Sequence, residues 1–216
     1  MKNIQILKIL AEKDFPAFLA EWKAIKEQLT QKEKQDLIVQ ILDDQYSDDY
    51  FGFYVKVFDK IIEGKVSLDF NIDHWATTLL SLTVHLVSRQ LFDYFLRKGA
   101  SLNFIGDTYA FESEESIQRE VGSSLSMRYE TCLDFAENKL ADALTTDYNY
   151  HVPEKEKDIT HWADVGSKEE ITINKQDYYY LLEQAKYLRD LIHTDRLVDH
   201  IKTLGGKTYR QLAQTK

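Results

Sequence analysis

The chain matches itself when it is shifted by 34 residues. VFDKIIEGKVSLDFNID (57–73) then lies under LFDYFLRKGASLNFIGD (91–107), and six of the seventeen positions are identical. The apolar positions match beyond these identities, and a third, shorter copy is LVDHIKTLGGKT (197–208). Self-similarity of this kind predicts a repeat protein, in which each unit buries its apolar face only against its neighbours.

In the second copy, the stretch LFDYFLRKGASLNF (91–104) predicts a helix that ends at Gly99. Its apolar positions share one helical face: Leu91, Phe92, Phe95 and Leu96. A glycine can adopt the left-handed conformation that satisfies the last carbonyls of a helix. The SLNF segment then alternates polar and apolar residues, which indicates an extended turn between one helix pair and the next.

The stretch DHWATTLLSLTVHLVSRQLFDYFLRKGASLN (73–103) resembles an ankyrin repeat. The family pattern is D-x-x-G-x-T-P-L-H-x-A-A, a short turn, a second helix, and then G-A-D-x-N. The corresponding residues are Asp73, Ala76, Thr78-Leu79-Leu80-Ser81, Gly99-Ala100-Ser101 and Asn103. TCLDFA (131–136) resembles T-P-L-D-x-A, and LGGKT (204–208) resembles the end of a last repeat.

The chain departs from the ankyrin pattern at three positions, which makes its copies degenerate. Leu79 stands where the family has proline, Ser81 where it has histidine, and Val87 where it has the glycine of the turn between the two helices.

The predicted fold is predominantly all-α: an ankyrin-like helical repeat array with an N-terminal helical cap and two insertions, in one continuous structural unit. Residues 1–46 are predicted to form the cap, as two or three helices, and residues 47–216 the degenerate repeats. The repeats span about 47–72, 73–106 and 126–216, and the insertions lie near 107–126 and 139–190. The second insertion has room for a short β-hairpin.

Two registers remain open near the C-terminus. YYYLLEQAKYLRDLIH (178–193) has the pattern of an amphipathic helix. This helix either belongs to the insertion that precedes the last helix, or is the first helix of a fourth repeat. In the second case Thr194 would be the N-cap of the last helix.

Charge and cysteine content limit the function classes. The chain has 27 basic and 36 acidic residues, a net charge of −9, which argues against nucleic acid and favours a basic protein partner or simple solubility. The single cysteine, Cys132, cannot form an internal disulfide and is expected to be a buried thiol. Because signal-peptide and membrane-spanning patterns are missing, we expect a cytoplasmic protein with no membrane partner.

The sequence does not predict an enzyme. It lacks the glycine-rich phosphate loops and the nucleophile elbow. His193 and His200 do not have the spacing of paired metal ligands, and His151 and His161 lie in a polar stretch that predicts a solvated loop. The expectation is no catalytic residue, no metal and no cofactor.

The ankyrin resemblance implies a non-catalytic protein-binding module. Such arrays bind a protein partner through a concave surface, which is made of finger tips and of the first helices of each repeat. By the family register, the expected partner-binding residues are His74, Trp75 and Thr77 on one finger, His85 and Leu86 at the end of its first helix, and Met127, Arg128 and Glu130 on the next finger. Trp75 is expected to be the main anchor, because exposed aromatic residues are frequent interface hot spots.

Three alternatives stay open. Ankyrin-like arrays occur among the immunity and antitoxin-like proteins of bacterial conflict systems, and an acidic surface would steer such a protein toward a basic toxin. A metal-dependent enzyme would use the histidines and carboxylates of the 139–177 insertion. The third alternative is self-association through the end repeats.

Overall fold

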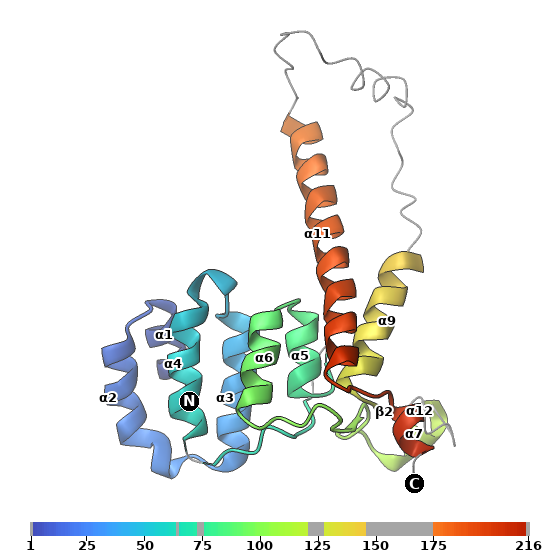
Figure 1. Cartoon of the computed structure of the whole chain (residues 1–216). Coiled ribbons are helices and arrows are strands. Elements are labelled where there is room, and N and C mark those ends of the chain that lie inside the picture. The colour runs from blue at the N-terminus through green and yellow to red at the C-terminus, as the bar shows by residue number, and fades with distance from the viewer. Residues whose placement is uncertain (1, 64, 73–75, 121–127, 146–174, 215–216) are drawn as a thin grey trace, which may run out of the picture.

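The computed structural model describes residues 2–63, 65–72, 76–120, 128–145 and 175–214, and these are mostly helical (Figure 1), which confirms the predicted all-α class. The α-helices are α1 (Lys2–Ala11), α2 (Phe15–Ile25), α3 (Gln31–Asp44), α4 (Phe51–Ile62), α5 (Leu79–His85), α6 (Arg89–Arg97), α7 (Glu114–Glu120), α9 (Cys132–Thr145), α11 (Lys175–Thr203) and α12 (Tyr209–Ala213). Two 3₁₀-helices are η1 (Lys26–Gln28) and η2 (Asp48–Tyr50). The strands β1 (Gly106–Asp107) and β2 (Tyr129–Glu130) pair antiparallel.

The first 46 residues contain three α-helices, within the two or three predicted. Asp14 caps α2 by accepting a hydrogen bond from the backbone N–H of Ala17 at 2.9 Å. The apolar residues that these helices bury include Phe18, Trp22, Ile25, Leu37, Ile38, Ile41 and Leu42. Phe15 and Leu19 are partly buried against the same core.

Six further helices of the described residues pack as pairs, namely α3 with α4, α5 with α6, and α9 with α11. Helix α4 also packs on α6, and α5 packs on α9, so the pairs lie side by side in a row (Figure 1). Helix α2 packs on α4 and covers the N-terminal end of the row. Helix α3, which the sequence division places in the cap, is therefore the packing partner of α4.

The first helix of each pair begins at a threonine. In each case the hydroxyl oxygen accepts a hydrogen bond from the backbone N–H three residues later, as N-capping requires. The caps are Thr30 with Glu33 (3.2 Å), Thr78 with Ser81 (3.1 Å), and Thr131 with Asp134 (3.3 Å). The same local chemistry thus starts α3, α5 and α9.

The second helix of each pair ends at a residue in the left-handed conformation. Gly99 has φ 103°, which confirms the helix end predicted there, Lys65 has φ 58° and Gly205 has φ 87°. The backbone N–H of each residue donates a hydrogen bond to the carbonyl oxygen three residues earlier, with an N to O distance of 3.0 Å. The acceptors are Leu96, Ile62 and Lys202, respectively. These bonds satisfy helix-end carbonyls that would otherwise lack a partner.

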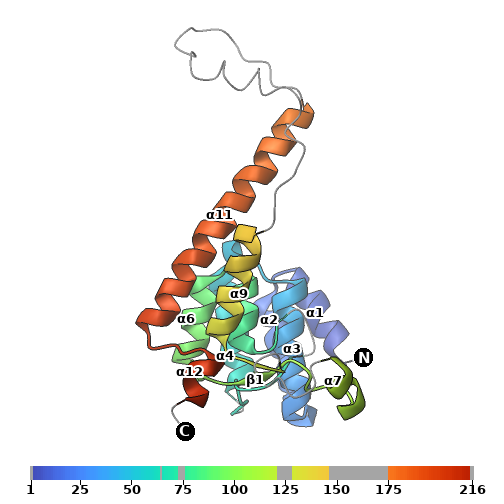
Figure 2. The ribbon, with the colours of Figure 1, turned by 90° about the vertical axis from the view of Figure 1, so that its right-hand side faces the viewer.

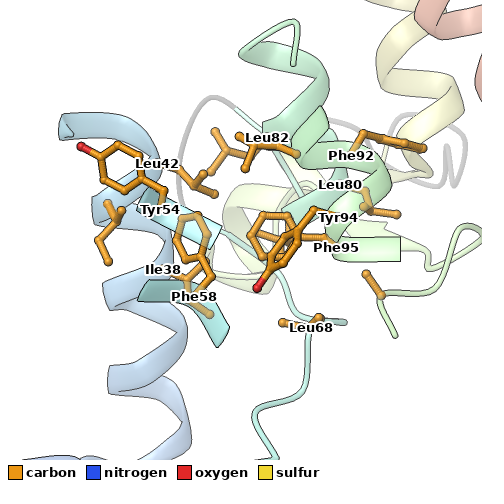
Figure 3. Close-up of a cluster of buried hydrophobic side chains, with 14 of the residues drawn as sticks. Ile38, Leu42, Tyr54, Phe58, Leu68, Leu80, Leu82, Phe92, Tyr94 and Phe95 are labelled. Carbon is orange, nitrogen blue, oxygen red and sulfur yellow. The ribbon is translucent and has the colours of Figure 1, made fainter. Parts of the chain in front are cut away.

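The second helices bury the same three positions. The buried residues are Val57, Phe58 and Ile61 on α4, Leu91, Phe92 and Phe95 on α6, and Leu197, Val198 and Ile201 on α11. Figure 3 shows the middle of this core, where side chains of α4 and α6 meet those of α3 and α5. Leu96, predicted on the buried face of α6, is only partly buried, while Tyr94 is buried.

Helix α11 differs from the prediction. It is one continuous helix of 29 residues, and its N-terminal part projects above the row of pairs (Figures 1 and 2). Thr194 is therefore not an N-cap: it is buried in mid-helix, and its Oγ1 donates a hydrogen bond to the carbonyl oxygen of Asp190 at 2.8 Å. The interpretation with Thr194 as the start of a new helix is wrong.

Only parts of the two predicted insertions belong to the described residues. Helix α7 lies between β1 and β2, within the first of them. Helix α9 runs to Thr145, beyond the point where the second insertion was expected to begin. The short hairpin expected in the second insertion falls on residues 146–174, outside the described residues.

We predict that Val87→Gly stabilises the protein. Val87 joins α5 to α6 with φ 55°, and the left-handed conformation costs an L-residue about 1–2 kcal/mol. Glycine removes this strain but costs about 0.5–1 kcal/mol in chain entropy on folding, so we expect a net gain of up to about 1.5 kcal/mol. Chemical denaturation of the variant measures this gain.

Val87→Ala is the matched control, because it removes the branched side chain and keeps most of the backbone strain. It should gain less than the glycine variant. Equal gains from both variants would show that the side chain, and not the backbone conformation, carries the cost.

Candidate binding groove

A groove of about 530 Å³ lies where the fingers meet the first helices of two neighbouring pairs. Here a finger is the turn that precedes α5 or α9. The residues that line the groove are Ile72, Ala76, Thr77, His85, Thr108, Glu130, Phe135, Asn138, Lys139 and Asp142. Three of the predicted partner-binding residues, Thr77, His85 and Glu130, are among them.

Backbone pairing holds each finger at its base. An isolated antiparallel bridge joins Asn71 to Thr78 before α5, and in β1 and β2 Gly106 pairs with Glu130 before α9. Asn71 also links the two fingers, because its Oδ1 accepts a hydrogen bond from the backbone N–H of Asp107 at 3.0 Å. The bases of the two fingers are therefore linked to each other.

Close contact between the fingers depends on Gly106. A Cβ atom at this position would lie 2.5 Å from Cγ2 of Thr77 and 2.6 Å from Cγ2 of Thr78. Contacts this short are excluded by the van der Waals radii, so a larger residue would push the fingers apart. The close approach places the Thr77 hydroxyl where it donates a hydrogen bond to the Glu130 carboxylate.

Glu130 is a partly buried carboxylate in the wall of the groove. Burial raises the pKa of Glu130, the hydrogen bond from Thr77 lowers it, and the charge of Asp134 raises it. No lysine, arginine or histidine of the described residues forms an ion pair with Glu130. Among the described residues, the hydrogen bond from the Thr77 hydroxyl is what stabilises the charged form of Glu130.

Lys139 lines the groove from α9, and its ammonium group is held by α5. The Nζ atom donates hydrogen bonds to the carbonyl oxygens of His85 at 2.7 Å and Val84 at 3.5 Å. Lysine at the C-terminal end of a helix satisfies carbonyls that have no partner within the helix. Burial lowers the pKa of Lys139. Lys139 therefore ties α9 to α5 at the end of the groove.

The other predicted binding residues lie elsewhere. Leu86 is partly buried against the core and lines a neighbouring pocket, together with His85 and Lys139. Arg128 is held at the base of the second finger, where its Nε and Nη2 atoms donate to Oδ2 of Asp107 at 3.1 Å and 3.0 Å. His74, Trp75 and Met127 fall outside the described residues, so the role of Trp75 as an anchor stays a prediction.

The sequence prediction missed the contribution of α9 to the groove. Phe135, Asn138, Lys139 and Asp142 all line it. Their spacing is i, i+3, i+4 and i+7, which puts them on one face of a helix. This periodicity is visible in the sequence and could have identified the face. The ankyrin register instead predicts partner binding by finger residues and by the end of the first helix α5.

Two of the residues considered for chemistry, Cys132 and His200, have structural contacts. Cys132 is buried, as predicted, and burial raises the pKa of its thiol to about 12. His200 Nε2 lies 2.6 Å from Asp93 Oδ1. Among the described residues, no group of three or more His, Cys, Asp or Glu side chains is placed to hold a metal ion. His151 and His161 fall outside those residues.

None of the helices that the structure describes combines the length and the apolar character needed to cross a membrane. Comparisons with known proteins give no match: no family model matches the sequence, and no curated protein or solved structure matches it. The groove must be interpreted from its own residues.

We predict that Glu130→Gln stabilises the fold at pH 7. The pKa of Glu130 is raised in the folded state. Protonation of Glu130 therefore stabilises the folded state, and this contribution is fully present when the pH is below the ordinary glutamate pKa of about 4.3. That contribution is lost as the pH rises through the raised pKa. Glutamine keeps an oxygen that can accept from Thr77 and carries no charge. Its advantage in melting temperature should therefore be present at pH 7 and shrink toward pH 4.

The control is Glu112→Gln, which neutralises an exposed carboxylate in the same finger and should leave the melting temperature nearly unchanged. If Glu130→Gln lowers the melting temperature equally at pH 4 and pH 7, the charge of Glu130 does not oppose folding.

Proposed function

We propose that the chain is a non-catalytic protein-binding module, built as a degenerate ankyrin-like array, that holds a protein partner in the groove between its fingers and its first helices. The observation that carries the proposal is that Thr77, His85 and Glu130, expected from separate parts of the sequence to bind a partner, line the same groove.

The recurring contacts support the repeat part of the proposal. The three threonine caps and the three left-handed helix ends recur along the chain, and a shift of 106 residues relates Gly99 to Gly205. The contacts between pairs recur as well. The Tyr94 hydroxyl donates to Asp59 Oδ1 at 2.9 Å, and at the related positions His200 Nε2 lies 2.6 Å from Asp93 Oδ1.

We infer from these contacts that the first repeat begins at Thr30, and not near residue 47. Thr30 caps α3 as Thr78 caps α5. In addition, Gln35 and Thr83, each five residues after the cap, are both buried. On this interpretation the cap is α1 and α2, which cover the apolar end that a repeat array leaves exposed.

The groove combines features that suit a peptide segment of a protein. It has apolar walls from Ile72, Ala76 and Phe135, and polar groups from Thr108 and Asn138. Protein interfaces typically join an apolar centre to a rim of hydrogen-bonding groups. No reactive group is needed for this role.

A narrower form of the proposal is an immunity or antitoxin-like protein that neutralises a basic toxin. The net charge of −9 would increase the rate of encounter with such a partner, and the carboxylate of Glu130 lies in the groove. The alternative of a metal-dependent enzyme gains no observation from the described residues.

We predict that Asn138→Arg abolishes partner binding and leaves the fold intact. Asn138 is exposed on α9 and lines the groove, so a long side chain there would block it. The matched control is Gln90→Arg, which places the same charge at an exposed position on α6 that does not line the groove. Cross-linked affinity capture from host lysate, followed by mass spectrometry, compares the variants with the wild type.

The expected result is one protein that is recovered by the wild type and Gln90→Arg and lost with Asn138→Arg. The circular dichroism spectra of all three should agree. If Asn138→Arg recovers the same proteins as the wild type, the groove is not the binding site.

A further inference from the structure

We propose that the groove accepts a lysine or arginine side chain of the bound protein, with Glu130 as the ion-pair partner of that cation. The inference rests on the proposed function, and it adds the chemistry by which the partner is recognised.

The first observation is the difference between Glu130 and other carboxylates of the same region. Arg128 pairs with Asp107 at 3.0 Å, and Lys202 pairs with Glu137 at 2.8 Å. For Glu130, the contact within the described residues is the hydroxyl of Thr77. Among the described residues, Asp107 and Glu137 thus have a cationic partner, and Glu130 has none.

The second observation concerns Lys139, the one lysine or arginine among the described residues that line the groove. Its Nζ atom donates to the carbonyl oxygens of His85 and Val84. Those two bonds fix the ammonium group at the end of α5. Lys139 forms no ion pair with Glu130.

The third observation is the apolar wall around the carboxylate. Ile72, Ala76 and Phe135 line the same groove as Glu130. Lysine and arginine side chains pack their methylene stems on apolar surface while the charged end reaches a polar partner. The face of an aromatic ring also attracts a cation. The groove thus offers a contact for each part of a long cationic side chain.

The partial burial of Glu130 strengthens such a pair. Water screens charges at an exposed surface, and exposed pairs contribute little to binding. A carboxylate that is partly removed from water in the free protein interacts more strongly with a cation that enters the groove than a fully solvated carboxylate does. The loss of one partner of a desolvated pair is correspondingly costly, which makes the pair selective for a charged side chain.

A displayed library of random short peptides tests the inference. The library is selected on the full chain, and the enriched peptides are synthesised and titrated by fluorescence anisotropy. We expect a lysine or arginine at a fixed position of the enriched peptides. Glu130→Gln should weaken their binding by about tenfold or more, the effect of removing a charged hydrogen-bond partner. Norleucine in place of lysine, or citrulline in place of arginine, should weaken wild-type binding by a similar factor.

The two changes should not add, because each removes the same ion pair. Glu112→Gln, a charge change at an exposed position of the second finger, should leave the affinity unchanged. It therefore controls for loss of the general negative field.

The outcomes separate the two proposals. Peptides that lose binding with Asn138→Arg, and bind wild type and Glu130→Gln equally, overturn the ion pair and leave the protein-binding groove in place. Peptides that are insensitive to both variants, or a library that yields no binder to the wild type, overturn both.

Discussion

The packing of each second helix against its neighbours holds this structure together. Helices α4, α6 and α11 each bury an apolar side chain at the same three related positions. In proteins most helical stability comes from packing of this kind. A polar contact marks the register in which the pairs pack: Tyr94 donates to Asp59, and His200 lies against Asp93. Helix α2 covers the remaining N-terminal side of α4. The stability of the fold therefore comes from the contacts between neighbouring helices and not from the single helices.

The groove follows from the same arrangement. Because the pairs lie side by side, the first helices α5 and α9 are adjacent, and the fingers that precede them are adjacent as well. Gly106 lets the fingers approach closely, and that approach brings Thr77 to Glu130. A carboxylate is partly buried there because the backbone pairing of β2 fixes its position. The cost of its burial is tolerated where the rest of the structure determines the geometry.

The sequence predicts the parts of this fold that depend on local chemistry. The helix end at Gly99 and the buried face of Leu91, Phe92 and Phe95 follow from turn chemistry and periodicity. The buried thiol of Cys132 follows from the general tendency of free cysteine to be buried. The continuity of α11 could not be predicted from local chemistry, because a threonine such as Thr194 is compatible with both a helix start and a helix interior. The Thr194 hydroxyl donates a hydrogen bond to the carbonyl oxygen of Asp190. Only the packing of the helix decides between a helix start and a helix interior at this position. Glu130 accepts a hydrogen bond from Thr77, which lies 53 residues away in the sequence. A contact over this separation cannot be predicted from a local sequence pattern.

Asp199 is exposed on α11 at the position that Asp59 and Asp93 occupy on the two preceding second helices. Each of those aspartates meets a tyrosine or a histidine of the following pair. A gene that gained one more unit by duplication would therefore find an acceptor already in place at the end of the row. Under the proposed repeat organisation, the chain could change its length in evolution without redesigning the contacts that join its parts.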